Sequence, residues 1–258
     1  LDAEKTSMQF YIAGAASLIL DFFCIFLPKT PAPLKGEPIK FKDLIFWDAW
    51  SLLKKPSFAV FMISSFLICI PLAAYYAYLQ NQMSAMGIDN VAAAKTLGQG
   101  SEIIFMLLMP LLFRKLGIKK MIAIGVFAWA LRYALFAIGA SENLTMMIYG
   151  GILLHGICYD FFFVSGQIYV DEVSPKNIRS QVQALNVFCT QGLGLFVGAI
   201  VCGKIFNQAF GDADAGDVAT LHLWSAFWWP LAIMATVILI LFVLAFRHKD
   251  DTNSSFNH

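Results

Sequence analysis

Long apolar stretches constrain this chain more than any other feature. A membrane-crossing helix needs about 20 mostly apolar residues. Seven stretches reach that length, at residues 7–27, 57–80, 92–113, 119–139, 144–168, 181–206 and 221–246. They are too long for strands and lack the alternating pattern of an outer-membrane barrel. We therefore predict an all-α membrane protein, a polytopic helical bundle with about seven transmembrane helices in contact with the lipid bilayer.

Composition excludes several other classes of protein. Only 14% of the 258 residues are charged, against about 25% in a soluble domain. The net charge of +1 lacks the basic surplus of a nucleic-acid-binding protein. The five Cys and four His show neither metal-ligand spacing nor a disulfide framework, and hydrolase motifs are absent. We predict a protein that is not an enzyme and that has no cofactor and no metal.

The basic residues predict the orientation of the helices. Cytoplasmic loops of membrane proteins carry an excess of Lys and Arg. If the spans alternate in direction, fourteen basic residues fall on one side and three on the other, and Arg132 lies within a span. The sequence therefore predicts an N-terminus outside the cell and a C-terminus in the cytoplasm.

The segment between the first two spans has a distinct character. Four prolines in 28–38 predict an extended connection. Residues 41–55 mix apolar and charged side chains at near-helical spacing, which predicts an amphipathic helix at the cytoplasmic membrane surface. Pro56 is expected to start the next helix. At the other end of the chain, 252–258 is predicted to be a disordered tail.

Ionisable side chains within spans are costly and usually functional. Gln99 and Glu102 are three residues apart and therefore share a helix face. An amide and a carboxylate facing one cavity can bind hydroxyl groups of a polar solute. The alternative is an interhelical hydrogen-bond clamp.

The fifth span carries the largest number of polar groups. His155 and Tyr159 stack on one helix face, four residues apart. Asp160 points about 100° further round the helix, where it either pairs with Arg132 or acts directly in transport. In the second span, Tyr76 is a candidate for stacking on a flat ring, with an interfacial aromatic belt as the alternative.

Small residues in the sixth span predict close helix packing. Gly194 and Gly198 form a small-xxx-small pattern. The five cysteines lie within spans and are expected to behave as small apolar residues.

Two motifs resemble a known family. The string His155-Gly-Ile-Cys-Tyr159-Asp160-Phe-Phe-Phe-Val-Ser-Gly166 and the following loop motifs at 173–175 and 179–183 resemble the tenth helix and next loop of nucleoside:proton symporters, a family of the major facilitator superfamily. Gln99-Gly-Ser-Glu102 and the basic turn at 114–120 resemble its eighth helix and following loop.

The resemblance covers most of 7–246 and implies that the seven spans are helices six to twelve of a twelve-helix transporter. The chain, which starts at Leu1, is then expected to be a fragment whose partner is the missing N-terminal half. The implied divisions are the last helix of the N-terminal half at 1–28, the inter-half linker at 29–56, the C-terminal six-helix half at 57–246 and a cytoplasmic tail at 247–258.

The resemblance also implies roles for individual residues. Gln99 and Glu102 match the family's eighth-helix amide and carboxylate, and Tyr159 and Asp160 match its tenth-helix aromatic and acid. His155 falls where some members have Tyr. The seventh helix departs from the family pattern, because members with known substrates have amides where this chain offers Tyr75 and Tyr76.

These features predict proton-coupled uptake of nucleosides by alternating access across a bacterial cytoplasmic (inner) membrane, by a monomer. The predicted substrate-binding residues are Gln99, Glu102, Tyr76, His155, Tyr159 and Asp160. Glu102 or Asp160 is expected to carry the coupled proton, since a buried carboxyl resists ionisation.

The sequence leaves two alternatives open. One is a major facilitator symporter for another polar solute, such as a sugar. The other is a seven-helix receptor, although the third span ends in Phe113-Arg114-Lys115 and the last span lacks Asn-Pro-x-x-Tyr.

Overall fold

A computed structural model describes residues 6–29, 38 and 40–247. The chain divides into two compact units, Leu1–Phe41 and Lys42–His258, and each is described by itself. The prolines within 30–37 and the tail at 252–258 lie outside the described residues. Within the described ranges the regular structure is entirely helical, which agrees with the prediction of an all-α protein.

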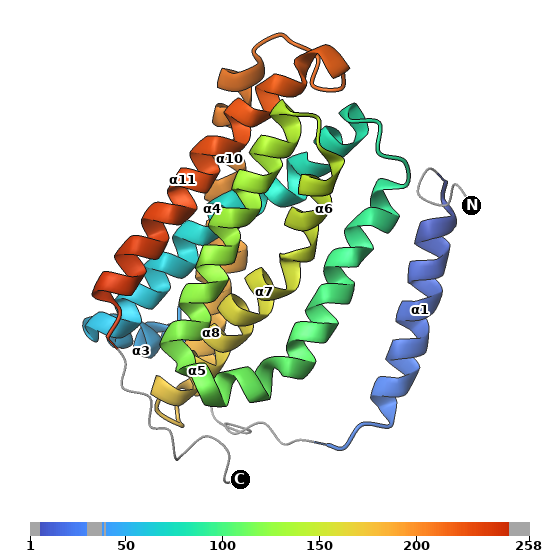
Figure 1. Cartoon of the computed structure of the whole chain (residues 1–258). Helices are drawn as coiled ribbons and strands as arrows, with labels where there is room; N and C mark the ends of the chain where they lie inside the picture. The colour runs from blue at the N-terminus through green and yellow to red at the C-terminus, as the bar shows by residue number, and fades with distance from the viewer. Residues whose placement is uncertain (1–5, 30–37, 39, 248–258) are drawn as a thin grey trace. The chain divides into compact units, whose positions relative to one another are not determined.

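The first unit contains helix α1, Met8–Ile25. The second unit is a bundle of long helices joined by short turns (Figure 1). Its elements are α2 Phe41–Leu44 at the boundary, α3 Trp47–Trp50, η2 Ser51–Lys54, α4 Pro56–Ala85, α5 Val91–Ser141, α6 Thr145–Leu153, α7 His155–Tyr159, η3 Asp160–Val164, α8 Ser165–Val173, α9 Arg179–Val187, η4 Phe188–Gly194, α10 Leu195–Phe210, η5 Val218–Thr220 and α11 Leu221–Ala245.

Helix α5 contains two of the predicted spans. Its 51 residues would extend about 77 Å as one straight helix, more than twice the roughly 30 Å core of a bilayer. The helix is broken at Gly117, where φ is 72° and ψ is 169°, a conformation that glycine adopts without steric cost. Figure 1 shows the ribbon reversing direction there. We call the parts before and after Gly117 the first and second arms of α5.

Six helical segments of the described chain are long and apolar enough to cross a membrane. Because α5 turns back on itself, these six account for all seven predicted spans. Pro56 occupies the first turn of α4, as expected.

The segment 41–55 differs from its prediction. Instead of one amphipathic helix, it forms α2, α3 and the 3-10 turn η2, interrupted at Phe46, where φ is 56°. The Phe46 ring packs against Phe188, with centroids 6.2 Å apart, and Trp50 Nε1 donates to the Ile45 carbonyl at 3.0 Å. These contacts favour a broken segment over the continuous helix that local spacing predicted.

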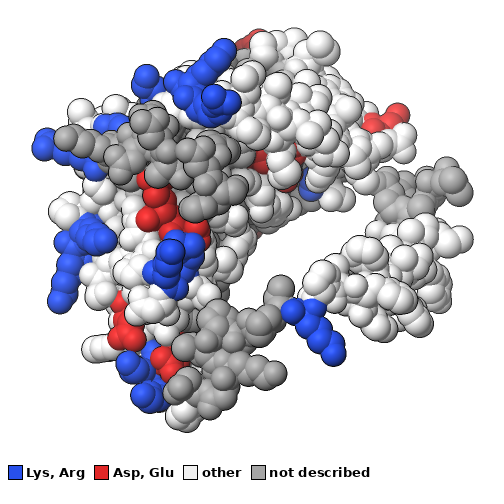
Figure 2. Space-filling model, turned by 90° about the horizontal axis from the view of Figure 1, so that it is seen from below, with Lys and Arg blue, Asp and Glu red and all other residues white. Residues whose placement is uncertain are grey.

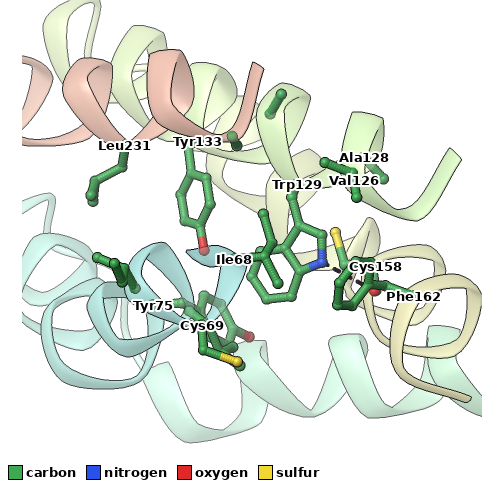
Figure 3. Packing of buried hydrophobic residues seen from close by; sticks show 14 of the residues in the cluster. Ile68, Cys69, Tyr75, Val126, Ala128, Trp129, Tyr133, Cys158, Phe162 and Leu231 are labelled. Atoms are coloured by element: carbon green, nitrogen blue, oxygen red, sulfur yellow. Dashed lines mark hydrogen bonds between the residues drawn. The ribbon is translucent and has the colours of Figure 1, made fainter. Parts of the chain in front are cut away.

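The core of the second unit is aromatic and lies between α4, α5, α7, η3 and α11. Trp129 has no exposed surface, and its Nε1 donates to the Cys158 carbonyl at 3.1 Å. Figure 3 shows this indole beside Ile68 of α4 and Phe162 of η3. The core therefore locks the second arm of α5 to the helical segments that carry the fifth span's polar residues.

Close packing at Gly194 and Gly198 is confirmed. A Cβ atom at Gly194 would lie 2.7 Å from the Cβ of Cys69, and one at Gly198 would lie 2.8 Å from the Cβ of Ala73. Both positions are in contact with α4, so only glycine allows this helix approach.

Basic side chains gather at the end of the second unit where α5 turns at Gly117, which Figure 2 views from below. Arg114, Lys115, Lys119 and Lys120 flank that turn in the sequence. Lys42 also pairs with Asp48 at 3.3 Å on this unit. The location of this end in the cytoplasm stays a prediction.

Candidate functional site

Four polar or aromatic side chains meet inside the second unit. We call Tyr75, Glu102, Arg132 and His155 the polar cluster. They come from α4, the two arms of α5, and α7. Arg132 is completely buried, and His155 is 5% exposed. Burial of ionisable groups among apolar helices is costly unless they are partnered, so this cluster is the strongest candidate for a functional site.

His155 lies between a carboxylate and a guanidinium. Its Nε2 is 3.8 Å from Glu102 Oε2, and its Nδ1 is 3.2 Å from Arg132 Nη1. The first distance allows electrostatic attraction but exceeds that of a direct hydrogen bond. The Glu102 side chain is 26% exposed. Glu102 therefore connects the buried part of the cluster to an accessible surface.

Arg132 is held by aromatic faces as well as by His155. Its guanidinium carbon lies 3.5 Å from the centroid of the Tyr75 ring, 5.4 Å from Trp129 and 5.6 Å from Phe136. A cation over an aromatic face is stabilised by about 2 kcal/mol or more when both are desolvated. These contacts offset part of the cost of burying the positive charge.

Tyr75 holds the cluster together from α4. Its ring stacks on His155, with centroids 5.4 Å apart and planes inclined by 20°. The centroid of the Tyr76 ring is 5.5 Å from that of the Tyr75 ring. Lys95 Nζ, near the start of α5, lies 5.8 Å from the Tyr75 centroid. Tyr75 thus touches both a cation and the imidazole that faces Glu102.

A close helix contact places Glu102 beside His155. The backbone N–H of Gly156 donates to Ser101 Oγ at 2.9 Å, and that hydroxyl donates to the Gly98 carbonyl at 2.8 Å. A Cβ atom at Gly156 would lie only 2.5 Å from the carbonyl carbon of Ser101. The two glycines and the serine therefore allow α7 to lie directly against the first arm of α5.

The structure brings together three of the six predicted site residues. Glu102 faces His155, and the ring of Tyr159 lies 5.9 Å from the His155 ring. Tyr76 is 49% exposed and lies next to the cluster through Tyr75. The Gln99 side chain is exposed, one turn before Glu102. The role of each residue stays a prediction.

Asp160 does not pair with Arg132. It is fully buried at the start of η3, and neither carboxylate oxygen has a hydrogen-bond partner among the described residues. Arg132 is hydrogen-bonded to His155 instead. Asp160 sits where the chain adopts a π-helix, a local irregularity that is frequent at functional sites.

Sequence reasoning missed the central roles of Tyr75 and Arg132. Tyr75 directly precedes Tyr76, the residue predicted to bind substrate. The apolar residues of α4 are spread almost evenly around the helix, so periodicity does not show which of the two tyrosines faces inward. For Arg132, the available signal in the sequence is a cation inside an apolar span. Its partner depends on helix packing.

The sequence matches the family model described as nucleoside H+ symporter over residues 1–251. The chain belongs to this family. The family is described as one of symporters, which argues against the receptor alternative. The resemblance to this family is therefore confirmed.

The chain is also similar to individual proteins whose names describe nucleoside transport. YegT of Escherichia coli strain K12 is 36% identical over 252 residues, which cover 97% of this chain and 59% of YegT. The nucleoside permease NupG of the same strain is 30% identical over 258 residues, covering 95% of this chain and 60% of NupG. The xanthosine permease of that strain is 26% identical, covering 97% of this chain and 61% of its own length. The chain thus spans about three fifths of these relatives.

Solved structures support the fold. A crystal structure of a point variant of the nucleoside transporter NupG superposes with a TM-score of 0.75 at 27% identity, covering 95% of this chain and 62% of that one. A second structure of NupG gives a TM-score of 0.70. The prediction of a major facilitator fold is confirmed, and with it a multi-pass membrane protein.

Proposed function

We propose that this chain forms part of a proton-coupled nucleoside importer that works by alternating access, in which a second half completes the substrate site. The observation that carries the proposal is the contact between Glu102 and His155, which joins two helices inside an apolar bundle. Family membership supports nucleosides as the solute class and protons as the coupling ion. The proposed setting is a bacterial inner membrane, with a monomer whose C-terminus is cytoplasmic.

The proposed substrate contacts follow from exposure and chemistry. Gln99 and Glu102 share one helix face and offer a donor and an acceptor to ribose hydroxyls. Tyr76 and Tyr159 flank the base by stacking, since aromatic rings with polar edges suit a flat heterocycle. His155 supports this wall of the site from behind, because it lies against both Glu102 and Tyr159.

Asp160 is the better candidate for carrying the proton. It is fully buried, and its oxygens lack hydrogen-bond partners among the described residues. An ionised carboxylate in such a place is costly, so loading and releasing a proton changes the local free energy strongly. Glu102 is partly exposed and faces His155, which suits a binding role.

The test is uptake of labelled uridine and adenosine by bacterial cells that lack their own nucleoside importers. The cells express this chain within its complete open reading frame, with and without a protonophore. We expect uptake that collapses when the protonophore is added. Absence of uptake, with the protein shown to be in the membrane, would contradict the assignment to nucleosides.

Two variants separate binding from coupling. We expect Glu102→Gln to raise KM about 10- to 100-fold, because a hydrogen bond to a charged group contributes about 1.5–3 kcal/mol. We expect Asp160→Asn to abolish accumulation while exchange of labelled for unlabelled nucleoside continues. Glu142→Gln, at an exposed helix end, is the matched control and should leave both measurements unchanged. Proton-driven accumulation by Asp160→Asn would assign coupling elsewhere.

A further inference from the structure

The hydrogen bond between Arg132 and His155 has only one possible direction. A guanidinium carries five N–H donors and no acceptor, and it stays protonated in proteins. Arg132 Nη1 lies 3.2 Å from His155 Nδ1. Nδ1 must therefore accept the bond with its lone pair. In a neutral imidazole one nitrogen accepts and the other carries the proton, so the ring proton of His155 is on Nε2.

Arg132 is not free to release this bond. Its side chain is completely buried, and its guanidinium lies 3.5 Å from the Tyr75 ring centroid with Trp129 and Phe136 nearby. Tyr75 also stacks on His155. One aromatic ring thus holds both partners of the hydrogen bond in register.

The other nitrogen of His155 faces the proposed substrate pocket. Nε2 is 3.8 Å from Glu102 Oε2, and the Glu102 side chain is 26% exposed. With the proton on Nε2, the imidazole presents a donor to the carboxylate. A modest shift of either side chain would close this distance to a hydrogen bond, as commonly happens when a substrate binds.

We propose that Arg132 is a positioning residue that fixes His155 as the neutral Nε2–H tautomer and thereby aims a hydrogen-bond donor at Glu102. The inference rests on the proposed function only in treating Glu102 as a substrate ligand. Its consequence is that His155 keeps the same protonation state while the carboxyl groups respond to pH.

Several other charged or titratable groups lie near Arg132 and His155 and can influence the pH dependence measured in the tests below. Lys95 and Glu102 come from the first arm of α5, Tyr75 from α4, and Tyr159 from the same helix as His155. The thiol of Cys158 lies beside Arg132. Lys95 carries the same charge as Arg132, and an ionised Glu102 carries the opposite one.

The direct test is nitrogen NMR of histidine-labelled protein, with the complete polypeptide in lipid nanodiscs. His155→Asn identifies the His155 signals by their loss. We expect an unprotonated Nδ1 and a protonated Nε2 whose shifts stay constant from about pH 5.5 to about pH 8, the range in which an unconstrained histidine changes charge. A protonated Nδ1, or a change to imidazolium within that range, would overturn the inference.

A second test uses transport. Arg132→Met removes the donor, whereas Arg132→Lys keeps a donor and a positive charge. We expect the methionine variant to acquire a KM that changes roughly fivefold between about pH 6.5 and about pH 7.5, since the protonated fraction of an unconstrained histidine with a midpoint near 6.5 falls from about one half to about one tenth over that unit. Adding His155→Asn should remove this dependence, and the lysine variant should lack it.

The exposed Arg114→Met serves as the control for loss of a positive charge. If Arg132→Met fails to fold, the NMR measurement on the unmodified protein alone decides whether His155 is the neutral Nε2–H tautomer. A methionine variant that folds and shows the unmodified pH profile would overturn the inference. If the NMR shows the expected tautomer but the protein takes up no nucleoside, the role of Arg132 stands and only the proposed substrate is refuted.

Discussion

Substitution of Gly156 by Ala tests whether the contact between α7 and the first arm of α5 builds the site. Gly156 lies directly after His155 and packs against Ser101 and Glu102. An alanine Cβ would lie 2.5 Å from the Ser101 carbonyl carbon and 2.6 Å from the Glu102 backbone nitrogen. Both atoms belong to backbone, so no side-chain rotation can relieve the clash.

The size of the effect follows from these distances. Ordinary contact begins at 3.4 Å, so the two helices would have to separate by about 0.9 Å. Overpacking of this kind costs about 1–3 kcal/mol. The separation would lengthen the bond from Gly156 N–H to Ser101 Oγ and widen the gap between His155 and Glu102. A misplacement of about 1 Å in a binding constellation can cost on the order of 100-fold.

The assay measures apparent melting temperature in detergent and KM for nucleoside uptake on the same variants. We expect Gly156→Ala to lower the melting temperature and raise KM by about 10- to 100-fold. Gly150→Ala, in the preceding helix, is the matched control because its Cβ would meet only Leu135 Cδ1 at 3.6 Å. Equal stability and equal uptake for the two variants would refute the argument that this contact sets the site.

Two further predictions concern residues that sequence reasoning passed over. Tyr75→Leu should lower the free energy of unfolding by about 0.5–2 kcal/mol, because it removes the aromatic ring that contacts Arg132 and His155. The exposed Tyr76→Leu should have the same melting temperature as the unmodified protein, and melting curves in detergent distinguish the two variants. Gln82→Leu should lower the free energy of unfolding by about 1–3 kcal/mol, because Gln82 donates to the Phe136 carbonyl at 3.0 Å and accepts from Trp228 Nε1 at 2.7 Å. A loss of stability no larger than that of the exposed Gln80→Leu would contradict this prediction.

The membrane bundle was predictable because its signal is local. Every backbone polar group in lipid must be satisfied within its own helix, so length and hydrophobicity alone identify the spans. The positions of Gly194 and Gly198 were equally readable, since their spacing on one helix face predicts close packing whatever the partner. Glu102, His155 and Asp160 stood out because charge within an apolar span is rare.

The partners of those residues were not predictable, because they depend on how helices pack. Sequence spacing placed Arg132 and Asp160 in neighbouring spans and allowed their pairing, but the structure joins Arg132 to His155 and Tyr75. The broken segment around Phe46 has the same origin, since contacts with a ring far along the chain outweigh local helical spacing.

The sequence by itself determined the class of the protein, the number of spans and the residues whose chemistry is out of place in lipid. Only the tertiary structure decided that Tyr75 rather than Tyr76 faces inward, that His155 lies between Glu102 and Arg132, and that Asp160 is buried without a hydrogen bond to Arg132. The physical reason is that hydrophobicity acts residue by residue, whereas a hydrogen bond or a cation over a ring requires two helices to meet at one height and one rotation.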